Sequence, residues 1–293
     1  MSADFKNGKE LLDLCKNRKC RISDIMIERE CQQSETSKET VLTRMGESWK
    51  IMKESATTPI KEPRKSIGGL IGGEAKMLNQ QLSSGKNICG NTLSRAIMYA
   101  MAVLEENTSM GLIVAAPTAG SSGIVPGVLL AMKEVYGFSD EEMISVLFNA
   151  GAVGYLAMRN ATVAGAVGGC QAEVGVASAM AASSAVELMG GTPVQCLYAA
   201  STVLMNMLGL VCDPVGGLVE YPCQLRNASG VANALTAAEI ALAGVPQLIS
   251  FDEMLEAMYT VGKKIPGELR ETALGGCAVT PTGCKYASCA GCS

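Results

Sequence analysis

Hydrophobic residues in this chain rarely alternate with polar ones, and most of them are small. The chain has 293 residues and is 48% hydrophobic, yet aromatic residues make up only 4% and there is a single Trp. A strand with one buried face alternates with a period of two, whereas an amphipathic helix repeats about every 3.6 residues. We therefore predict a mainly α fold, in which helices rich in Ala and Gly pack closely.

Apolar positions at helical spacing predict helices over residues 9–17, 22–33, 39–55, 91–107, 140–156, 171–189, 193–208, 229–243 and 251–263. Four candidate capping boxes mark helix starts: Thr36 with Glu39, Ser139 with Glu142, Thr192 with Gln195, and Ser250 with Glu253. In such a box two side chains satisfy backbone N–H groups that the first helical turn leaves unpaired.

Three regions follow from shifts in composition. Residues 1–65 are charged and predict an N-terminal helical region, which a Pro- and Gly-rich linker from Thr57 to Ala75 joins to the main body. Residues 66–276 form a helical domain of small apolar residues. Residues 277–293 predict a flexible, low-complexity tail rich in cysteine.

Charge and hydropathy exclude several classes of protein. The net charge is −4, and the only basic cluster is Lys61–Lys65, so we expect no binding to nucleic acid. The most apolar stretch, Val194–Val211, contains polar residues and is shorter than the ~20 residues of a membrane span, which favours a buried helix. The polar, charged first residues are unlike a secretory signal, so we expect a cytoplasmic protein without membrane contact.

The cysteine and histidine counts narrow the chemistry further. Twelve cysteines without a secretory signal argue against a disulfide scaffold. The chain has no His, which excludes every Ser–His, Cys–His or His-ligated zinc site built from this chain alone. An isolated cysteine is ordinarily a small buried hydrophobe, and we interpret five that way: Cys15, Cys20, Cys31, Cys89 and Cys196.

Three other cysteines lie beside Gly or Pro in unusual settings. Cys170 is in GGCQAEVG, Cys212 in GLVCDPVGG and Cys223 in EYPCQLRNASG, with 41 and 10 residues between them. This spacing excludes a local metal finger and indicates a site that is closed by tertiary folding. A [4Fe–4S] cluster normally takes four thiolates. Three of them would leave one iron open to act as a Lewis acid.

A tight loop from Pro117 to Gly123 is a second candidate site. Its backbone N–H groups and hydroxyls predict an anion nest at a helix start, suited to a carboxylate or phosphate. The candidate substrate-binding residues are Thr118, Ala119, Gly120, Ser121, Ser122, Gly123 and, three residues after Cys223, Arg226. Pyridoxal phosphate chemistry also uses such loops but needs a lysine, and no lysine occurs between Glu134 and Gly262.

The tail offers a rival metal site. The spacing of Cys284, Cys289 and Cys292 matches the first three cysteines of a plant-type ferredoxin. Together with Cys277 they are equally suited to zinc. At this level both interpretations, and that of no metal in the tail, stay open.

The strings APTAGSSGIVPG, GCQAEVGVASAMAA, LGLVCDPVGGLVEYPCQLRNA and ETALGG resemble the α portion of the iron–sulfur-dependent L-serine dehydratases. The likeness runs from about Leu70 to Gly276, and more loosely into the N-terminal helices. It implies a mainly helical catalytic domain that holds a [4Fe–4S] cluster on Cys170, Cys212 and Cys223. In this family the β portion is fused N-terminally or is a separate subunit, so the resemblance implies a separate β subunit here.

The resemblance also implies a reaction, the elimination of water from L-serine to give pyruvate and ammonia, as in amino-acid degradation. Some relatives that are fused into one chain use a penultimate Cys to cap the fourth iron when substrate is absent, which implies that role for Cys292, although the tail holds other cysteines. Met205 stands where some relatives keep a His. A histidine base would therefore have to come from the β subunit.

Three alternatives remain at this stage. The first is an L-cysteine desulfidase on the same scaffold, in which a thiol is the leaving group. The second is an electron-transfer iron–sulfur protein, whose cluster has four Cys ligands and a reversible one-electron couple. The third is a metal-binding module without catalysis, formed by the tail.

Overall fold

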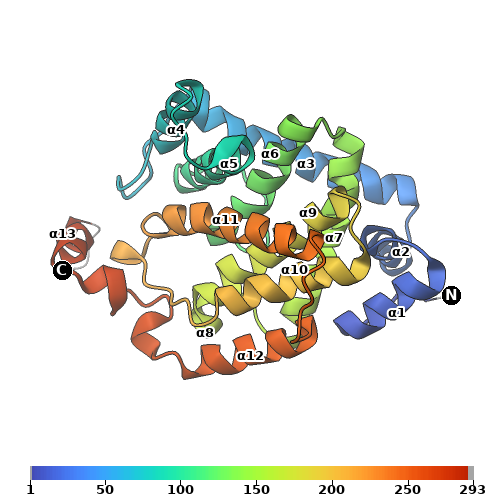
Figure 1. The fold of residues 1–293 in the computed structure, drawn as a ribbon. Coiled ribbons are helices and arrows are strands. Elements are labelled where there is room, and N and C mark those ends of the chain that lie inside the picture. The colour runs from blue at the N-terminus through green and yellow to red at the C-terminus, as the bar shows by residue number, and fades with distance from the viewer. Residues whose placement is uncertain (1, 290–293) are drawn as a thin grey trace.

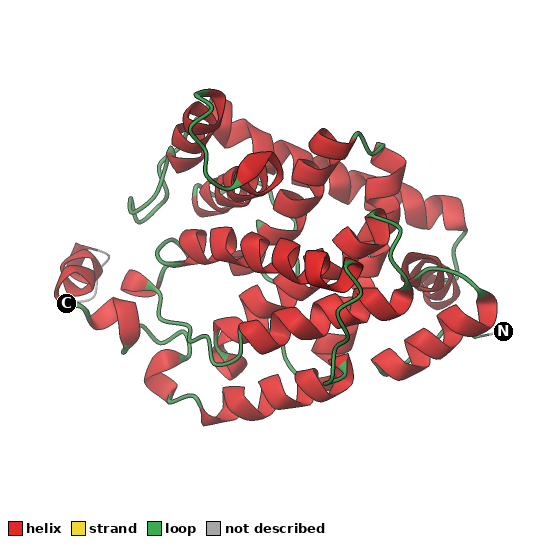
Figure 2. Cartoon of the chain, viewed as in Figure 1, coloured by secondary structure: helices red, strands yellow, loops and turns green. Residues whose placement is uncertain are grey.

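The computed structural model describes residues 2–289, and these form helices joined by short loops (Figure 1). The α-helices are α1 (Gly8–Arg18), α2 (Ile22–Ser34), α3 (Lys38–Lys61), α4 (Glu74–Ser83), α5 (Gly90–Thr108), α6 (Ile124–Tyr136), α7 (Asp140–Asn160), α8 (Gly165–Gly168), α9 (Val176–Leu188), α10 (Pro193–Asn206), α11 (Cys223–Leu242), α12 (Phe251–Lys264) and α13 (Pro281–Cys289). Figure 2 shows no strand among the described residues, where an isolated parallel bridge joins Cys212 to Arg270. The predicted mainly α fold is confirmed.

Three of the four predicted capping boxes are confirmed, at the starts of α7, α10 and α12. The box predicted at Thr36 and Glu39 is wrong, because Ser37 caps α3 by accepting a hydrogen bond from the Thr40 N–H at 3.2 Å. Thr36 instead donates its own N–H to the Cys31 carbonyl and so closes the end of α2. The choice between the two hydroxyl residues depends on where the preceding helix stops.

Other boundaries also shift. Helix α3 continues through Pro59 to Lys61, so the linker predicted from Thr57 begins five residues later, at Glu62. Helix α11 begins at Cys223, six residues before the predicted start at Ser229. A 3₁₀ turn at Gly276–Val279 spans the start of the predicted tail, and helix α13 lies within it.

Helix α9 lies at the centre of the fold. Every residue from Val176 to Glu187 is buried, and α9 packs against α6, α7, α10 and α11 (Figure 1). Its side chains are mostly Ala, Ser and Val, so the neighbouring helices approach closely. A Cβ atom added at Gly230 of α11 would lie 2.8 Å from the Ser178 Oγ, too near for any real side chain. Small residues are therefore a requirement of this packing.

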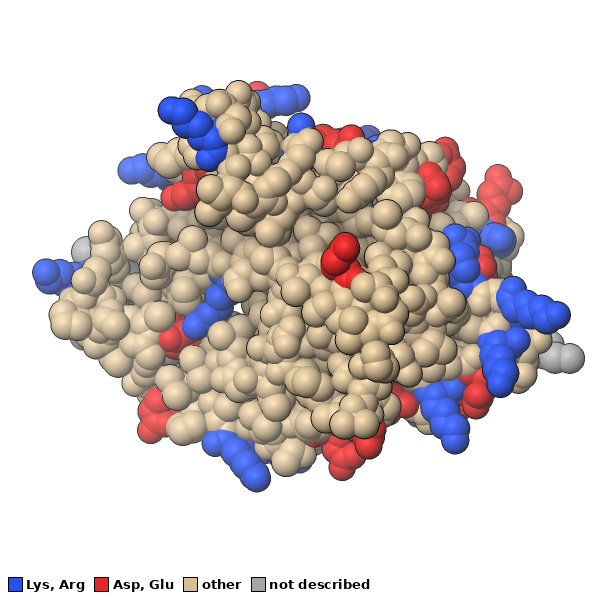
Figure 3. Space-filling model, viewed as in Figure 1, with Lys and Arg blue, Asp and Glu red and all other residues tan. Residues whose placement is uncertain are grey.

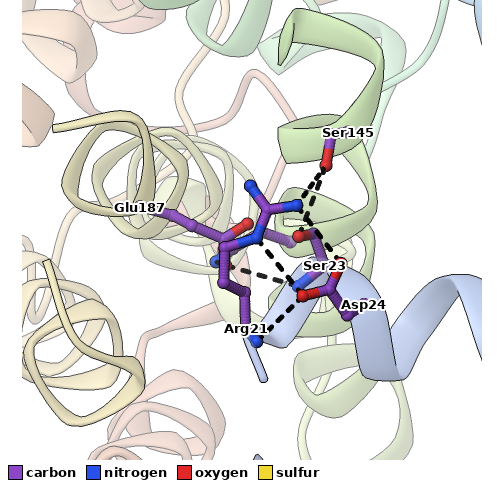
Figure 4. Close-up of polar contacts among 6 residues, drawn as sticks. Arg21, Ser23, Asp24, Ser145 and Glu187 are labelled. Carbon is purple, nitrogen blue, oxygen red and sulfur yellow. Dashed lines mark hydrogen bonds and ion pairs between the residues drawn. The ribbon is translucent and has the colours of Figure 1, made fainter. Parts of the chain in front are cut away.

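A buried polar network joins α2 to this core (Figure 4). The Glu187 carboxylate accepts hydrogen bonds from the Ser23 N–H at 3.3 Å and from the Asn149 Nδ2 at 2.7 Å. Next to it, Arg21 pairs with Asp24 and donates to the Ser145 hydroxyl at 3.2 Å. Both hydrogen bonds to Glu187 reach one oxygen, Oε2, of a carboxylate that is 6% exposed, and these partners offset part of the cost of its burial, whereas the buried Oε1 has no hydrogen-bond partner.

Charged side chains of both signs lie on the surface (Figure 3), as the net charge of −4 leads us to expect. On the face drawn in Figure 3, Lys and Arg side chains are scattered along the edges among Asp and Glu, and the middle is largely uncharged. This face therefore lacks the concentrated basic surface that nucleic acid requires. Among the described residues, none of the helices combines the length and the apolar character that crossing a membrane would need.

Close helix packing leads to a stability prediction for two helical glycines. A Cβ added at Gly127 of α6 would lie 2.8 Å from the Ala96 carbonyl oxygen of α5, whereas one at Gly151 of α7 meets only the Met26 Cε at 3.9 Å. Gly127→Ala should lower the free energy of unfolding by ~1–3 kcal/mol through overpacking. Gly151→Ala should leave it unchanged or raise it by up to ~1 kcal/mol, because Ala favours helix. Urea denaturation measures both, and equal stability of the two variants would contradict this account of the packing.

Candidate metal centre

The three predicted ligands come from three different elements. Cys170 directly precedes a π-helical segment, Gln171–Gly175, that leads into α9, and the sharp turn before it needs Gly169, whose φ is +76°. Cys212 lies in an extended segment, and its backbone N–H donates a hydrogen bond to the Leu269 carbonyl at 2.8 Å. Cys223 is the first residue of α11. All three are buried.

These elements bring the three cysteines to one cavity of about 20 Å³. Its remaining lining residues are Gly120, Glu173, Val174, Pro214, Val219 and Glu271. The Cys170 and Cys212 sulfurs and a Glu173 carboxylate oxygen lie within 4.8 Å of one another, a spacing at which one metal centre could reach all three. Tertiary folding thus brings together residues that are far apart in sequence.

The three thiols differ in acidity. A hydrogen bond from the Cys212 thiol, with a smaller contribution from the Arg226 charge, holds the pKa of Cys170 below its usual value despite burial. The same interaction, together with burial, raises the pKa of Cys212. Burial raises the pKa of Cys223 to about 12. Cys170 is therefore the thiol most readily ionised, as a metal ligand must be.

Arg226 lies on the first turn of α11, and its guanidinium contacts other residues of the protein. Its Nη2 lies 2.7 Å from the Asp213 carboxylate, while its Nη1 donates to the Val211 carbonyl at 2.9 Å and contacts the Cys170 sulfur at 3.5 Å. The predicted ligand of Arg226, a substrate carboxylate, would therefore have to compete with these groups of the protein for the guanidinium. Its nearest anionic partners are a cysteine ligand and a buried aspartate.

The sequence did not lead us to predict the carboxylates of this site. The Cys212 thiol lies 3.9 Å from the Glu173 Oε2, and burial raises the pKa of Glu173. A Cβ at Gly165 would lie only 2.5 Å from that same oxygen, so this glycine makes room for the carboxylate. A charged residue within the small-residue string GGCQAEVG was the available signal, since such a residue is rarely buried without a role.

The loop from Thr118 to Gly123 borders the cavity but uses many of its own polar groups. Asn227 of α11 accepts from the Gly123 N–H at 3.1 Å and donates to the Gly120 carbonyl at 2.8 Å. The Ser122 hydroxyl donates to the Ala119 carbonyl, and the Ser121 hydroxyl pairs with that of Thr118. Of the loop, Gly120 lines the cavity. The structure thus places Gly120, in the middle of the predicted substrate loop, at the cysteines, and the loop is held by hydrogen bonds within itself and to Asn227.

The remaining candidates lie apart from the three cysteines or beyond the described residues. None of the residues lining the cavity is a lysine, so the described chain offers no Schiff-base partner there. Cys277 lines a separate, larger cavity of about 430 Å³, together with Tyr221 and Tyr286, and Cys284 is exposed. The proposed fourth ligand, Cys292, lies outside the described residues.

The donor set is compatible with an iron–sulfur cluster. Three convergent sulfurs, with the pKa of one thiol lowered by the Cys212 hydrogen bond and, to a smaller extent, by the Arg226 charge, are the ligands such a cluster takes. A cavity of about 20 Å³ is small for it, so the lining would have to move outward. One of the lining residues, Glu271, is exposed.

Comparison with known proteins identifies the family of the chain. A family model described as serine dehydratase alpha chain matches residues 17–278. A probable L-serine dehydratase alpha chain of Bacillus subtilis is 48% identical over 279 residues, covering 95% of this chain and 93% of the relative. The L-serine dehydratase alpha chain of Peptoniphilus asaccharolyticus is 46% identical, covering 96% of each.

A longer relative is similar over one part of its length. An L-serine dehydratase of Escherichia coli is 36% identical over an alignment of 292 residues, which covers 94% of this chain and 62% of that protein. The family model spans all three cysteines, the loop beside them and Glu173. On these grounds the chain belongs to the serine dehydratase alpha-chain family.

Proposed function

We propose that this chain is the α subunit of an iron–sulfur L-serine dehydratase, which converts L-serine to pyruvate and ammonia together with a β subunit. The observation that carries the proposal is the convergence of Cys170, Cys212 and Cys223 on one cavity. The names of its relatives support the choice of serine as substrate.

The cluster would be held by the three cysteines, with Cys292 as the proposed fourth ligand while substrate is absent. When bound, it supplies a Lewis-acidic iron, which makes a hydroxyl group a better leaving group. Overall, the reaction removes the Cα proton and the hydroxyl of serine as water. The resulting aminoacrylate tautomerises to an imine, which one water hydrolyses to pyruvate and ammonium.

Within the chain, Glu173 is our candidate for receiving the Cα proton. Its carboxylate borders the cavity, and burial raises its pKa, which makes it a stronger proton acceptor than an exposed carboxylate. The backbone at Gly120, next to Glu173, is our candidate for orienting the substrate carboxylate. The rest of the loop acts by holding Gly120 in place through Asn227.

A second subunit follows from the family and from the composition. The relatives most similar in length are named alpha chains, while the Escherichia coli relative extends well beyond the matched region. With no His in this chain, a histidine base would have to come from the β subunit. Glu173 and a β-subunit histidine are thus two distinct sources for the base, and they can be told apart by experiment.

The cluster assignment is tested by removing the thiols singly. Cys170→Ala, Cys212→Ala and Cys223→Ala should each abolish the brown chromophore and lower bound iron severalfold, since two thiolates hold a cubane poorly. Cys196→Ala is the matched control, because Cys196 is equally buried but lies on α10 away from the cavity. Iron and sulfide analysis after anaerobic purification measures the effect. Full iron content in any one of the three variants would contradict that residue's assignment.

The role of Glu173 is tested by an isosteric change. Glu173→Gln should retain iron and sulfide but lower kcat for serine by ~10²–10⁴, the usual contribution of a general base. Glu271→Gln is the control, because Glu271 lines the same cavity but is exposed. Unchanged turnover in Glu173→Gln would assign the base to another group.

The need for a partner is tested by adding it. The isolated chain should bind iron yet form little pyruvate from serine, and the separate β chain should restore turnover. A coupled pyruvate assay under anaerobic conditions measures this, with L-cysteine as the alternative substrate. Full turnover by the chain alone would show that the base lies within it, and faster turnover of L-cysteine would favour the desulfidase.

A further inference from the structure

We propose that the Arg226–Asp213 ion pair is a positioning device that fastens the C-terminal segment, residues 275–289, to the cysteine site. The inference rests on the proposed cluster site and adds a role for two residues that line neither cavity. Its basis is a continuous series of contacts from the Cys170 sulfur to the Cys277 backbone.

The first half of this chain of contacts faces the cysteines. Arg226 touches the Cys170 sulfur through Nη1 and Asp213 through Nη2, and the arginine and aspartate side chains are only 15% and 3% exposed. At such burial a lone guanidinium or carboxylate would be costly, so each charge depends on the other. The pair thus fixes the position of the cation beside Cys170.

The second half faces the C-terminal segment. The other oxygen of Asp213, Oδ2, accepts the Cys277 N–H at 2.6 Å. The preceding residue, Gly276, has φ +59°, and a Cβ there would lie 2.1 Å from the same Oδ2. Glycine at this position is thus required twice, by its backbone angle and by the close approach of the carboxylate.

The sequence positions of Asp213 and Arg226 show which parts of the protein the ion pair connects. Asp213 directly follows Cys212, and Arg226 is three residues after Cys223, so both members of the pair stand beside cluster ligands in sequence. Beyond Cys277 the chain enters α13, which packs against the turn at Val215–Gly217 that follows Asp213. One carboxylate therefore connects the cysteine site to the start of the segment that leads toward Cys292.

The test uses two variants that break the contact in different ways. Asp213→Asn keeps the shape and removes the charge. Gly276→Ala keeps every charge and displaces the carboxylate. Their controls are Asp4→Asn, which removes the aspartate partner of the buried Arg29, and Gly244→Ala, where φ is +80° but nothing lies within 4 Å of the added Cβ.

Hydrogen exchange of residues 275–280, followed by mass spectrometry, measures the anchor whether or not iron is bound. Loss of a charge-assisted hydrogen bond should speed exchange there by about tenfold in both variants and in neither control. Unchanged exchange in both Asp213→Asn and Gly276→Ala would overturn the anchor. If one of the two variants fails to fold, the exchange rate of the other variant tests the anchor.

Two readouts on the iron-loaded protein test the connection to the cysteines. Iron release to a chelator in air should be faster in Asp213→Asn than in Asp4→Asn. The midpoint potential of the cluster should become more negative in Arg226→Gln and return toward the wild-type value in Arg226→Lys, because a cation near a ligand sulfur favours the reduced state. Faster exchange with unchanged iron release and potential would overturn the connection. Absence of iron from the wild-type chain would instead refute the proposed function, while the exchange experiment would still decide the anchor.

Discussion

The close approach of helices around α9 is the constraint on which the rest of the structure depends. Because α9 carries mostly Ala, Ser and Val, four helices pack directly on it. Two of the three cysteine positions follow from that packing. Cys170 stands at the start of the π-helical segment that leads into α9, and Cys223 begins α11, which lies against α9. A bulkier α9 would separate these helix starts and with them the sulfurs.

The electrostatics of the site follow from burial. Three thiols and Glu173 meet in a small cavity, and the only cation that contacts a ligand sulfur among the described residues is Arg226. Burial makes negative charge costly here, so it raises the pKa of Cys223 and of Glu173, while Cys170 alone is shifted toward thiolate. A site of this kind favours the binding of metal cations, because each ionised ligand gains a partner when a metal arrives.

Sequence patterns predicted helix starts correctly where the two residues of the capping contact lie close together in the sequence. The boxes at Ser139, Thr192 and Ser250 begin helices as predicted, since both partners lie within one turn. Thr36 failed because its N–H belongs to the end of α2, which a three-residue pattern does not include. The start of α11 was placed six residues late, because Pro222 and Cys223 look like loop until tertiary contacts fix the first turn, from Asn227 to Gly120 and Gly123 and from Arg226 to Asp213.

The sequence by itself determined the helical class, the family resemblance and the three cysteines, because these depend on periodicity, composition and residue identity. Only the tertiary structure decided that the three sulfurs share a cavity, that Glu173 joins them, and that Arg226 is paired with Asp213. The physical reason is that a carboxylate or guanidinium can reach many partners from one sequence position. Which partner it takes is set by burial, since a buried charge must be satisfied by whichever opposite charge or hydrogen-bond partner the packed helices bring within reach.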